Sequence, residues 1–245
     1  MRRSTSSSWR RLVSVMPQPL STAAPNAGYS LANSWDNPSE ANPRLALLAL
    51  TVISQWSLLE NLVNSIFIKL LGVNPKPAAA IYATIRSQAG QRDAFQSIVR
   101  QFIDDEGLRD VLLACLELFK RSSKLRNRIA HWVWGSCLSI PDGLLLADPD
   151  LLTAETVDWQ DKVQKFIQNP SPQHGLGGMP TKEGIWVYKE QDFIDGIQKI
   201  QRTSGLLGMA RAIMDSKIHN LPYAQLLTQL SNEPEVRQEL DRRSK

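Results

Sequence analysis

The chain has 245 residues, enough to bury a substantial hydrophobic core in one large domain or two small ones. Hydrophobic residues make up 42% and charged residues 21%, a balance that is typical of a globular protein and excludes a disordered chain. The 28 basic and 24 acidic residues give a net charge of +4, which is too small to indicate a nucleic-acid partner by itself. No run approaches the roughly 18 consecutive apolar residues of a membrane span, so we expect no membrane partner.

Cysteines and histidines are few in this chain. The two cysteines, Cys115 and Cys137, form no CxxC pair, which favours a reducing compartment and a cytoplasmic protein with both thiols in the core. The three histidines, His131, His174 and His219, lie far apart in the sequence, so a zinc site would require them to converge from distant segments. We therefore expect no structural metal and no cofactor.

The N-terminal segment has an unusual composition. Residues 1–42 are rich in Ser, Pro, Asn and Ala without any period, which predicts a disordered N-terminal arm. Met1–Arg11 is rich in Arg and Ser like a targeting peptide, whereas Leu12–Leu20 contains two prolines and is too weakly apolar for a secretory signal. An organelle address and a start at Met16 both stay open.

Three amphipathic helices are predicted in the first half of the chain. The first covers residues 43–72, where apolar residues recur at helical spacing. The second begins at Asn74 and breaks near Gly90. The third follows the acidic run Asp104–Glu106, which suits the positive end of a helix, and carries an apolar stripe to His131. Short loops between these helices predict an antiparallel helical bundle.

A small β-structure is predicted next. Apolar runs on both sides of Pro141-Asp142-Gly143 indicate an antiparallel hairpin near residues 134–146, to which Ile185–Tyr188 adds a third strand. The Pro- and Gly-rich stretch 160–184 is expected to be a long loop, and a further amphipathic helix is expected from Asp192.

These elements suggest three parts of the chain. The N-terminal arm precedes a helical domain over residues 43–215, which accommodates the hairpin and loop as an insertion at 133–190. Residues 216–245 follow as a C-terminal helical tail, whose last stretch is balanced in charge and nearly free of apolar residues.

The end of the third predicted helix carries the densest run of a single charge sign. Between residues 120 and 131 the sequence contains basic residues and no acidic one; the five basic residues are Lys120, Arg121, Lys124, Arg126 and Arg128. Such a run is most often only a solvated helix face. At about 100° per residue, Arg126 falls at roughly 200° from Lys124, inside the apolar stripe. A core-facing arginine needs an anion, which leaves two interpretations: an ion pair with Glu60 or a site for a phosphate.

The run Arg126-Asn127-Arg128-Ile129-Ala130-His131 resembles the Arg-x4-6-His motif of HEPN domains. A polar residue follows the arginine and a small residue precedes the histidine, as is frequent in that family, and the motif lies near the end of a long helix. The resemblance covers about residues 43–135, with the helix from Asp192 as a further element; the stretch 136–190 departs from the minimal family bundle.

The resemblance implies a homodimeric, metal-independent endoribonuclease, acting in a toxin or anti-phage system, or a non-catalytic module that binds a nucleotide, RNA or a protein. An antitoxin or a nucleotidyltransferase is a further partner to consider. RNA cleavage without metal needs an acid–base group and a positive charge for the pentacoordinate phosphate, which a histidine and an arginine supply. The motif and the basic run together assign catalysis to Arg126, Asn127 and His131, RNA binding to Arg121, Lys124 and Arg128, and a supporting role to Glu60.

One geometric difficulty concerns the motif itself. Arg126 and His131 are five residues apart, so on a continuous helix they point about 140° away from each other. They converge only where the helix distorts near Ala130 or where two chains contribute to one site. A simpler interpretation of His131 is a cation at the negative end of the helix, and an accidental match of the motif is the third alternative. Exposure of Arg126 and His131 in one groove favours the enzyme, whereas Arg126 sealed against Glu60 favours the binding module.

Overall fold

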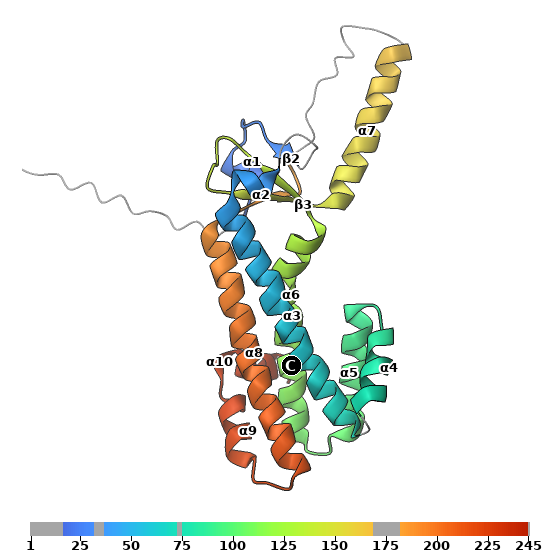
Figure 1. Cartoon of the computed structure of the whole chain (residues 1–245), viewed down its shortest axis with the longest axis vertical. Coiled ribbons are helices and arrows are strands. Elements are labelled where there is room, and N and C mark those ends of the chain that lie inside the picture. Colours follow the sequence, from blue (N-terminus) through green and yellow to red (C-terminus); the bar gives the residue numbers. More distant parts are fainter. Residues whose placement is uncertain (1–16, 32–36, 73–74, 169–181, 245) are drawn as a thin grey trace, which may run out of the picture. The chain divides into compact units, whose positions relative to one another are not determined.

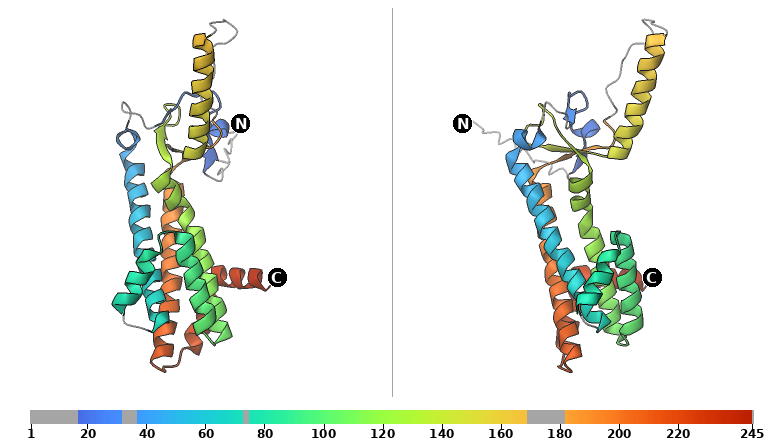
Figure 2. Two further views of the ribbon diagram at one scale, coloured as in Figure 1. Left: turned by 90° about the vertical axis from the view of Figure 1, so that its right-hand side faces the viewer. Right: turned by 45° about the vertical axis from the view of Figure 1, so that its right-hand side comes forward.

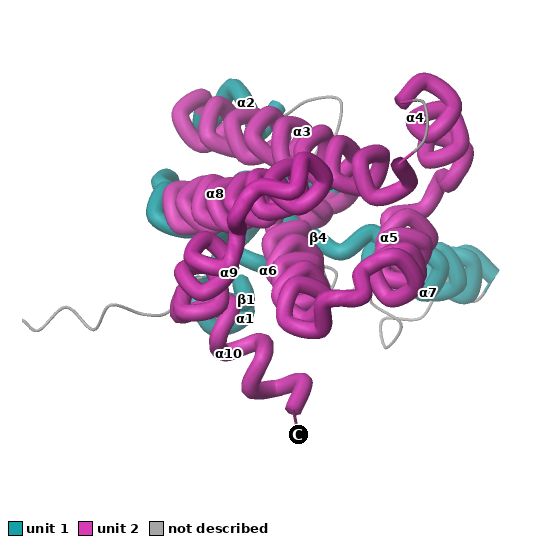
Figure 3. Tube along the Cα trace, turned by 90° about the horizontal axis from the view of Figure 1, so that it is seen from below, with its two compact units in different colours: residues 1–42, 133–192 teal, residues 43–132, 193–245 magenta. Residues whose placement is uncertain are grey.

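The computed structural model describes residues 17–31, 37–72, 75–168 and 182–244, and it is mainly helical with a small antiparallel sheet (Figure 1). The chain divides into two compact units. Unit 1 comprises residues 1–42 and 133–192, and unit 2 comprises residues 43–132 and 193–245 (Figure 3). The candidate targeting segment, Met16 and His174 lie outside the described residues.

Unit 2 contains the predicted helices. The three predicted from the first half of the sequence appear as α3 (Pro43–Leu71), the pair α4 (Pro75–Thr84) and α5 (Gln88–Phe102), and α6 (Glu106–His131). Three more follow, namely α8 (Glu190–Ile218), α9 (Ala224–Ser231) and α10 (Pro234–Arg243). Helices α3, α6 and α8 run alongside one another in both views of Figure 2.

Aromatic contacts on the buried stripe of α3 hold unit 2 together. Trp56 is fully buried and stacks on Phe119 of α6, with 4.6 Å between the ring centroids and 18° between the planes. Phe67 lies 4.4 Å from the ring of Tyr82 on α4 and 6.0 Å from that of Phe95 on α5. Helix α3 is therefore the element on which α4, α5 and α6 pack.

Polar contacts connect α8 to the same bundle. The hydroxyl groups of Ser122 on α6 and Thr203 on α8 lie 2.8 Å apart in the core, so one donates to the other, and the one that accepts donates its own proton to the backbone carbonyl four residues earlier. Lys69 near the end of α3 forms an ion pair with Asp215 of α8. Because the paired hydroxyls are buried, they fix the register of α6 against α8.

By length and composition alone, α3 could cross a membrane. The core helix of a globular protein passes the same test, and α3 buries one full stripe on its neighbours in unit 2. Its remaining surface includes the partly exposed polar side chains Glu60 and Lys69 and also the exposed leucines Leu47, Leu50 and Leu58.

The start of α6 follows the sequence prediction. Asp105 caps the helix, accepting a hydrogen bond of 3.0 Å from the Leu108 N–H, and the hydroxyl of Tyr223 donates to its other oxygen at 2.8 Å. The backbone hydrogen bond from Leu108 is the largest cause that lowers the pKa of Asp105 below its ordinary value, followed by the Tyr223 hydroxyl.

Unit 1 is built around a five-stranded antiparallel sheet in the order β1-β5-β4-β3-β2. The strands are β1 (Gln18–Pro19), β2 (Ser30–Leu31), β3 (Val133–Ser136), β4 (Leu144–Ala147) and β5 (Ile185–Tyr188). The predicted hairpin is confirmed as β3 and β4, which pair antiparallel with Gly135 opposite Leu145, and β5 is the predicted third strand.

The structure differs from the predicted disordered arm at residues 17–31 and 37–42. These residues form the edge strands β1 and β2 and two short helices, α1 (Leu20–Ala23) and α2 (Pro38–Ala41). Leu20 is fully buried in an apolar cluster with Leu145 and Val187. Such two-residue strands pair through their backbone groups, so they leave no apolar period in the sequence.

The expected loop and the C-terminal tail also differ from the sequence prediction. Helix α7 (Pro149–Gln168) occupies the first part of the expected loop, and residues 169–181 lie outside the described residues. It begins where the Asp148 carboxylate accepts from the Asp150 N–H at 3.0 Å, with proline at the first helical position. The C-terminal tail belongs to unit 2, because Val236 of α10 is fully buried.

The helix break predicted near Gly90 occurs earlier, at residues 85–87. Gly90 lies in the first turn of α5, where its N–H donates to the hydroxyl of the capping residue Ser87 at 3.0 Å. A Cβ at position 90 would approach Ile85 Cγ2 to 2.9 Å, so the glycine allows the loop to turn closely over the helix start.

We predict that Asp105→Ala lowers the free energy of unfolding by about 1–2 kcal/mol at neutral pH, because α6 loses its N-cap. The folded-state pKa of Asp105 lies below its unfolded value of about 3.9, so this stabilisation is fully present above that value and is lost as the pH falls through the folded pKa. Urea unfolding at pH 7 and below pH 4 measures both effects. Asp104→Ala, at the exposed neighbour, is the matched control, and equal losses in the two variants would contradict the capping role.

Candidate functional site

The cavity at the end of α6 collects most of the residues that the motif singles out. It lies within unit 2 and has a volume of about 510 Å³. Its lining residues come from α3, from the loop before α5 and the start of α5, and from the last turns of α6; they are Glu60, Arg86, Gln88, Gln91, Arg126, Asn127 and His131. All three predicted catalytic residues and the predicted supporting carboxylate therefore line one space.

Arg126 is half-buried and lacks the partner that one interpretation of the sequence gave it. Its Nη1 donates to Asn127 Oδ1 at 3.2 Å, and its Nε is buried without a hydrogen-bond acceptor. Glu60 forms no ion pair with it; its Oε1 accepts from Gln88 Nε2 at 2.7 Å instead. Among the described residues no carboxylate forms an ion pair with Arg126.

Other half-buried arginines of unit 2 behave differently. Arg92 lies 3.2 Å from Asp93, Arg109 lies 3.4 Å from Glu106, and Arg211 lies 4.0 Å from Asp215. A guanidinium that is partly removed from water is costly unless a carboxylate or several acceptors compensate it. Arg126 has one neutral amide oxygen, which leaves its remaining donors available to an anion in the cavity.

The charges around the cavity also favour an anion. Two arginines and one carboxylate line it, which leaves a net positive charge even with His131 neutral. Burial first and the negative charge of Glu60 second raise the pKa of Tyr82 to about 12. The Glu60 carboxylate therefore interacts with Tyr82 on α4 as well as with Gln88 on α5.

The helix geometry of the motif is regular. Helix α6 continues through His131, so the distortion near Ala130 considered from the sequence does not occur. Asn127 and His131 are four residues apart and share a helix face, while Arg126 lies on the edge toward the core. Arg126 still lines the cavity together with them, and its side chain is oriented by Asn127 Oδ1.

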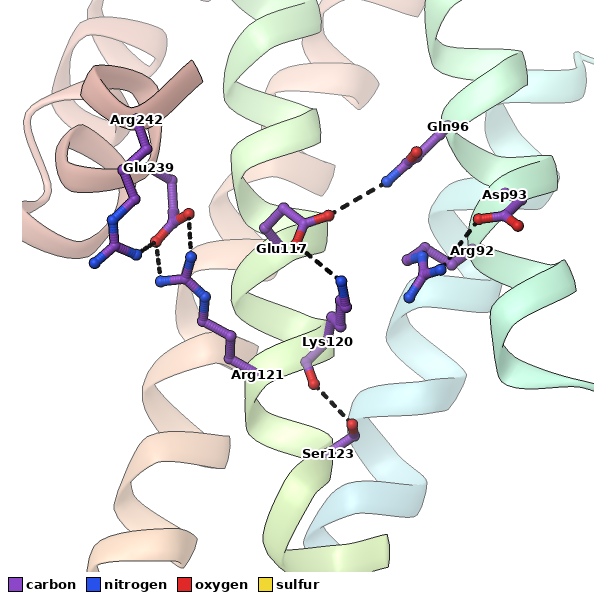
Figure 4. A network of polar contacts seen from close by, with 9 residues as sticks. All are labelled: Arg92, Asp93, Gln96, Glu117, Lys120, Arg121, Ser123, Glu239 and Arg242. Carbon is purple, nitrogen blue, oxygen red and sulfur yellow. Dashed lines mark hydrogen bonds and ion pairs between the residues drawn. The ribbon is translucent and has the colours of Figure 1, made fainter. Parts of the chain in front are cut away.

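Arg121, predicted to bind RNA, instead anchors α10. Its Nη2 donates to Glu239 Oε2 at 2.8 Å, and Nη1 contacts the other oxygen of the same carboxylate. Glu239 is only 3% exposed and also accepts from Arg242 Nη1 at 2.7 Å, as Figure 4 shows. A bidentate pair on a buried carboxylate is a structural contact, so Arg121 is not available to a ligand in this arrangement.

The other basic residues of the run differ in their surroundings. Lys120 lies 3.7 Å from Glu117 on the same helix (Figure 4). The guanidinium of Arg128 lies over the Trp132 ring at 4.8 Å from its centroid. Lys124 is exposed, and its charge, together with that of Arg121, contributes after burial to lowering the pKa of Lys199 on α8. Lys124 and Lys199 form the more open basic surface beside the motif.

Sequence reasoning did not identify Arg86, Gln88 and Gln91 as site residues. They lie about 35 or more residues before the motif, and no periodic pattern connects them to it. The signal available in the sequence was Ser87, a residue type that commonly caps helices. It marks the start of α5 and therefore places Gln88 and Gln91 in the first turn of that helix.

A second cavity, of about 600 Å³, lies within unit 1 between α2, β2, β3 and the 137–143 segment. Its lining is mostly apolar and backbone, and it contains none of the predicted site residues. Within the described ranges, no group of three or more His, Cys, Asp or Glu side chains is arranged to hold a metal ion. The cavity of unit 2 is therefore the candidate site.

No family model, no curated protein and no solved structure matches this chain.

We predict that Arg121→Ala lowers the free energy of unfolding by about 1–3 kcal/mol, because it leaves the buried Glu239 carboxylate with a single partner. Lys124→Ala, three residues further along the same helix and exposed, should change stability by no more than about 0.5 kcal/mol. Chemical denaturation of both variants compares them directly. A fully stable Arg121→Ala protein would show that the contact between α6 and α10 does not depend on this pair.

Proposed function

We propose that the protein is a metal-independent endoribonuclease of the HEPN type, cleaving RNA at a site formed by Arg126, Asn127 and His131. The observation that carries the proposal is that Arg126, unpaired with any described carboxylate, lines the same cavity as His131. The helical bundle of unit 2, with the motif in the last turns of its α6 helix, supports the family assignment.

The proposed reaction uses the residues as follows. His131 accepts the proton of a ribose 2′-hydroxyl, whose oxygen attacks the adjacent phosphorus. Arg126, held by Asn127, stabilises the negative charge that develops on the non-bridging oxygens of the pentacoordinate phosphate. The bond from phosphorus to the 5′-oxygen breaks, and a second acidic group protonates that oxygen. The products are a 2′,3′-cyclic phosphate and a 5′-hydroxyl.

The second acidic group is the reason to include a homodimer in the proposal. The cavity contains one histidine, whereas the reaction needs a base for one oxygen and an acid for the other. A second copy of the chain that places its own motif beside the first would supply another His131 and another Arg126. This arrangement also accommodates the regular helix between the two residues.

The cellular setting follows from the family resemblance alone. We propose a cytoplasmic effector of a toxin or anti-phage system, for which an antitoxin or a nucleotidyltransferase would be the partner. The competing proposal is a non-catalytic module that uses the same cavity to bind a nucleotide, RNA or a protein. The two proposals differ in whether bound RNA is cut.

We predict that the purified protein cleaves single-stranded RNA in the presence of EDTA and leaves 2′,3′-cyclic phosphate ends, identified by mass spectrometry of the products. His131→Ala and Arg126→Ala should each lower the rate by a factor of order 10² or more, because they remove the acid–base group and the charge that stabilises the transition state.

His219→Ala is the matched control for this experiment, because His219 is exposed after α8 and is absent from the cavity lining. The fold of each variant is checked by circular dichroism. A folded His131→Ala protein that cuts RNA at the wild-type rate would contradict the catalytic role and favour the binding module.

We also predict a dimer at micromolar concentration, measured by light scattering coupled to size exclusion. The expected mass is twice 27.5 kDa. A monomer at all concentrations where RNA is cut would contradict the composite site and require an acid from within one chain.

A further inference from the structure

We propose that Arg86, together with Arg126, binds one phosphate group of the substrate strand, so that Arg86 is a second phosphate-binding residue of the cavity. The inference rests on the proposed function for the identity of the ligand, a phosphodiester, but not for the presence of the anion site. Arg86 is outside the sequence motif and belongs to the loop between α4 and α5.

The loop that carries Arg86 is held by two local hydrogen bonds. Gln91 Nε2 donates to the carbonyl of Ile85 at 2.9 Å, immediately before Arg86. The Ser87 hydroxyl accepts from the Gly90 N–H at 3.0 Å, immediately after it. A Cβ at position 90 would meet Ile85 Cγ2 at 2.9 Å and the Ser87 hydroxyl at 3.0 Å, so a side chain there would require its neighbours to shift. Arg86 is thus exposed at the cavity while its backbone is held on both sides.

The two arginines of the cavity outnumber the one described carboxylate of its lining. Among the described residues, neither Arg86 nor Arg126 has an ion pair, and Glu60, the acidic residue of the lining, accepts from Gln88 Nε2 at 2.7 Å. Gln88 follows Arg86 by two residues. The segment 86–88 therefore contributes the Arg86 cation to the cavity and also donates a hydrogen bond to Glu60. Arginine donors are arranged in a planar fork that matches phosphate oxygens.

Arg86 and Arg126 reach the cavity from different elements, α5's preceding loop and α6. A phosphate between them would accept hydrogen bonds from two guanidinium groups. His131, which lines the cavity together with Asn127, would then lie beside the adjoining ribose. Of the two, Arg86 is the more exposed and Arg126 the more buried. We therefore infer that a strand meets Arg86 first and that Arg126 contacts the phosphate at the bottom of the cavity.

The test measures binding separately from cleavage. A fluorescein-labelled oligodeoxythymidylate of eight nucleotides has phosphodiesters but no 2′-hydroxyl, so it cannot be cut by this chemistry. Its affinity is measured by fluorescence anisotropy over a range of salt concentrations, with displacement by inorganic phosphate as a second arm. The variants are Arg86→Gln, Arg86→Lys and Arg126→Gln. Arg100→Gln is the matched control, an exposed arginine on α5 that is absent from the cavity lining.

We expect Arg86→Gln and Arg126→Gln each to raise the Kd for the oligonucleotide by about tenfold and to reduce the dependence of log Kd on log salt by about 0.7. Arg86→Lys should recover part of the affinity, and Arg100→Gln should stay within about twofold of the wild type. Inorganic phosphate should displace the probe from the wild type at lower concentration than from Arg86→Gln.

Two results would overturn the inference: Arg86→Gln binding like the wild type, or Arg100→Gln losing as much affinity as Arg86→Gln. The cleavage assay separates this inference from the proposed function. If RNA is cut and Arg86→Gln binds the probe and cuts RNA as well as the wild type, the proposed role of Arg86 is contradicted while the proposed ribonuclease activity is retained. If the probe binds with the expected dependence on Arg86 and no RNA is cut, the ribonuclease is wrong while the anion site stands.

Discussion

Within the described residues no ion pair joins Glu60 to Arg126, and the proposed anion site in the cavity of unit 2 depends on this; Glu60 Oε1 instead accepts a hydrogen bond from Gln88 Nε2. Glu60 is the carboxylate among the described lining residues, and a bond to Arg126 would have closed the site as an internal ion pair. Within the described part of the chain, the acceptor that Arg126 contacts is Asn127 Oδ1. A partly buried guanidinium with unused donors is favourable in a site for an anion and unfavourable as a packing element.

The frame that holds this arrangement is the α6 helix. Asp105 fixes its first turn, Phe119 stacks on Trp56 of α3 in its middle, and His131 is its last residue. Arg121 connects the same helix to α10 through the buried Glu239. The basic run therefore has two uses along one helix, because Arg121 contributes to the packing of unit 2 while Arg126 and His131, about one and three turns later, line the cavity.

Elements with a period or a cap were predictable from the sequence. The apolar stripes of α3 and α6, the acidic start of α6 and the turn between β3 and β4 all have local signals. Strands β1 and β2 have none, because two residues pair through backbone alone. The motif placed Arg126, Asn127 and His131 in one cavity. Arg86 meets the motif through packing of distant segments, as in the bond from Gln88 to Glu60 across 28 positions, and Arg121 pairs with Glu239 across 118 positions; a single sequence reveals neither contact.

A double-mutant cycle between Glu60 and Arg126 measures whether these two side chains form an ion pair in solution. The variants are Glu60→Gln, Arg126→Met and the two combined, and the free energy of unfolding is measured for each by urea denaturation. Since Glu60 bonds to Gln88 and not to Arg126, we expect the two effects to add, with a coupling below about 0.5 kcal/mol. A coupling above about 1 kcal/mol would mean that Glu60 and Arg126 are ion-paired in solution, and the arginine would then be a structural residue with no free donors for a phosphate.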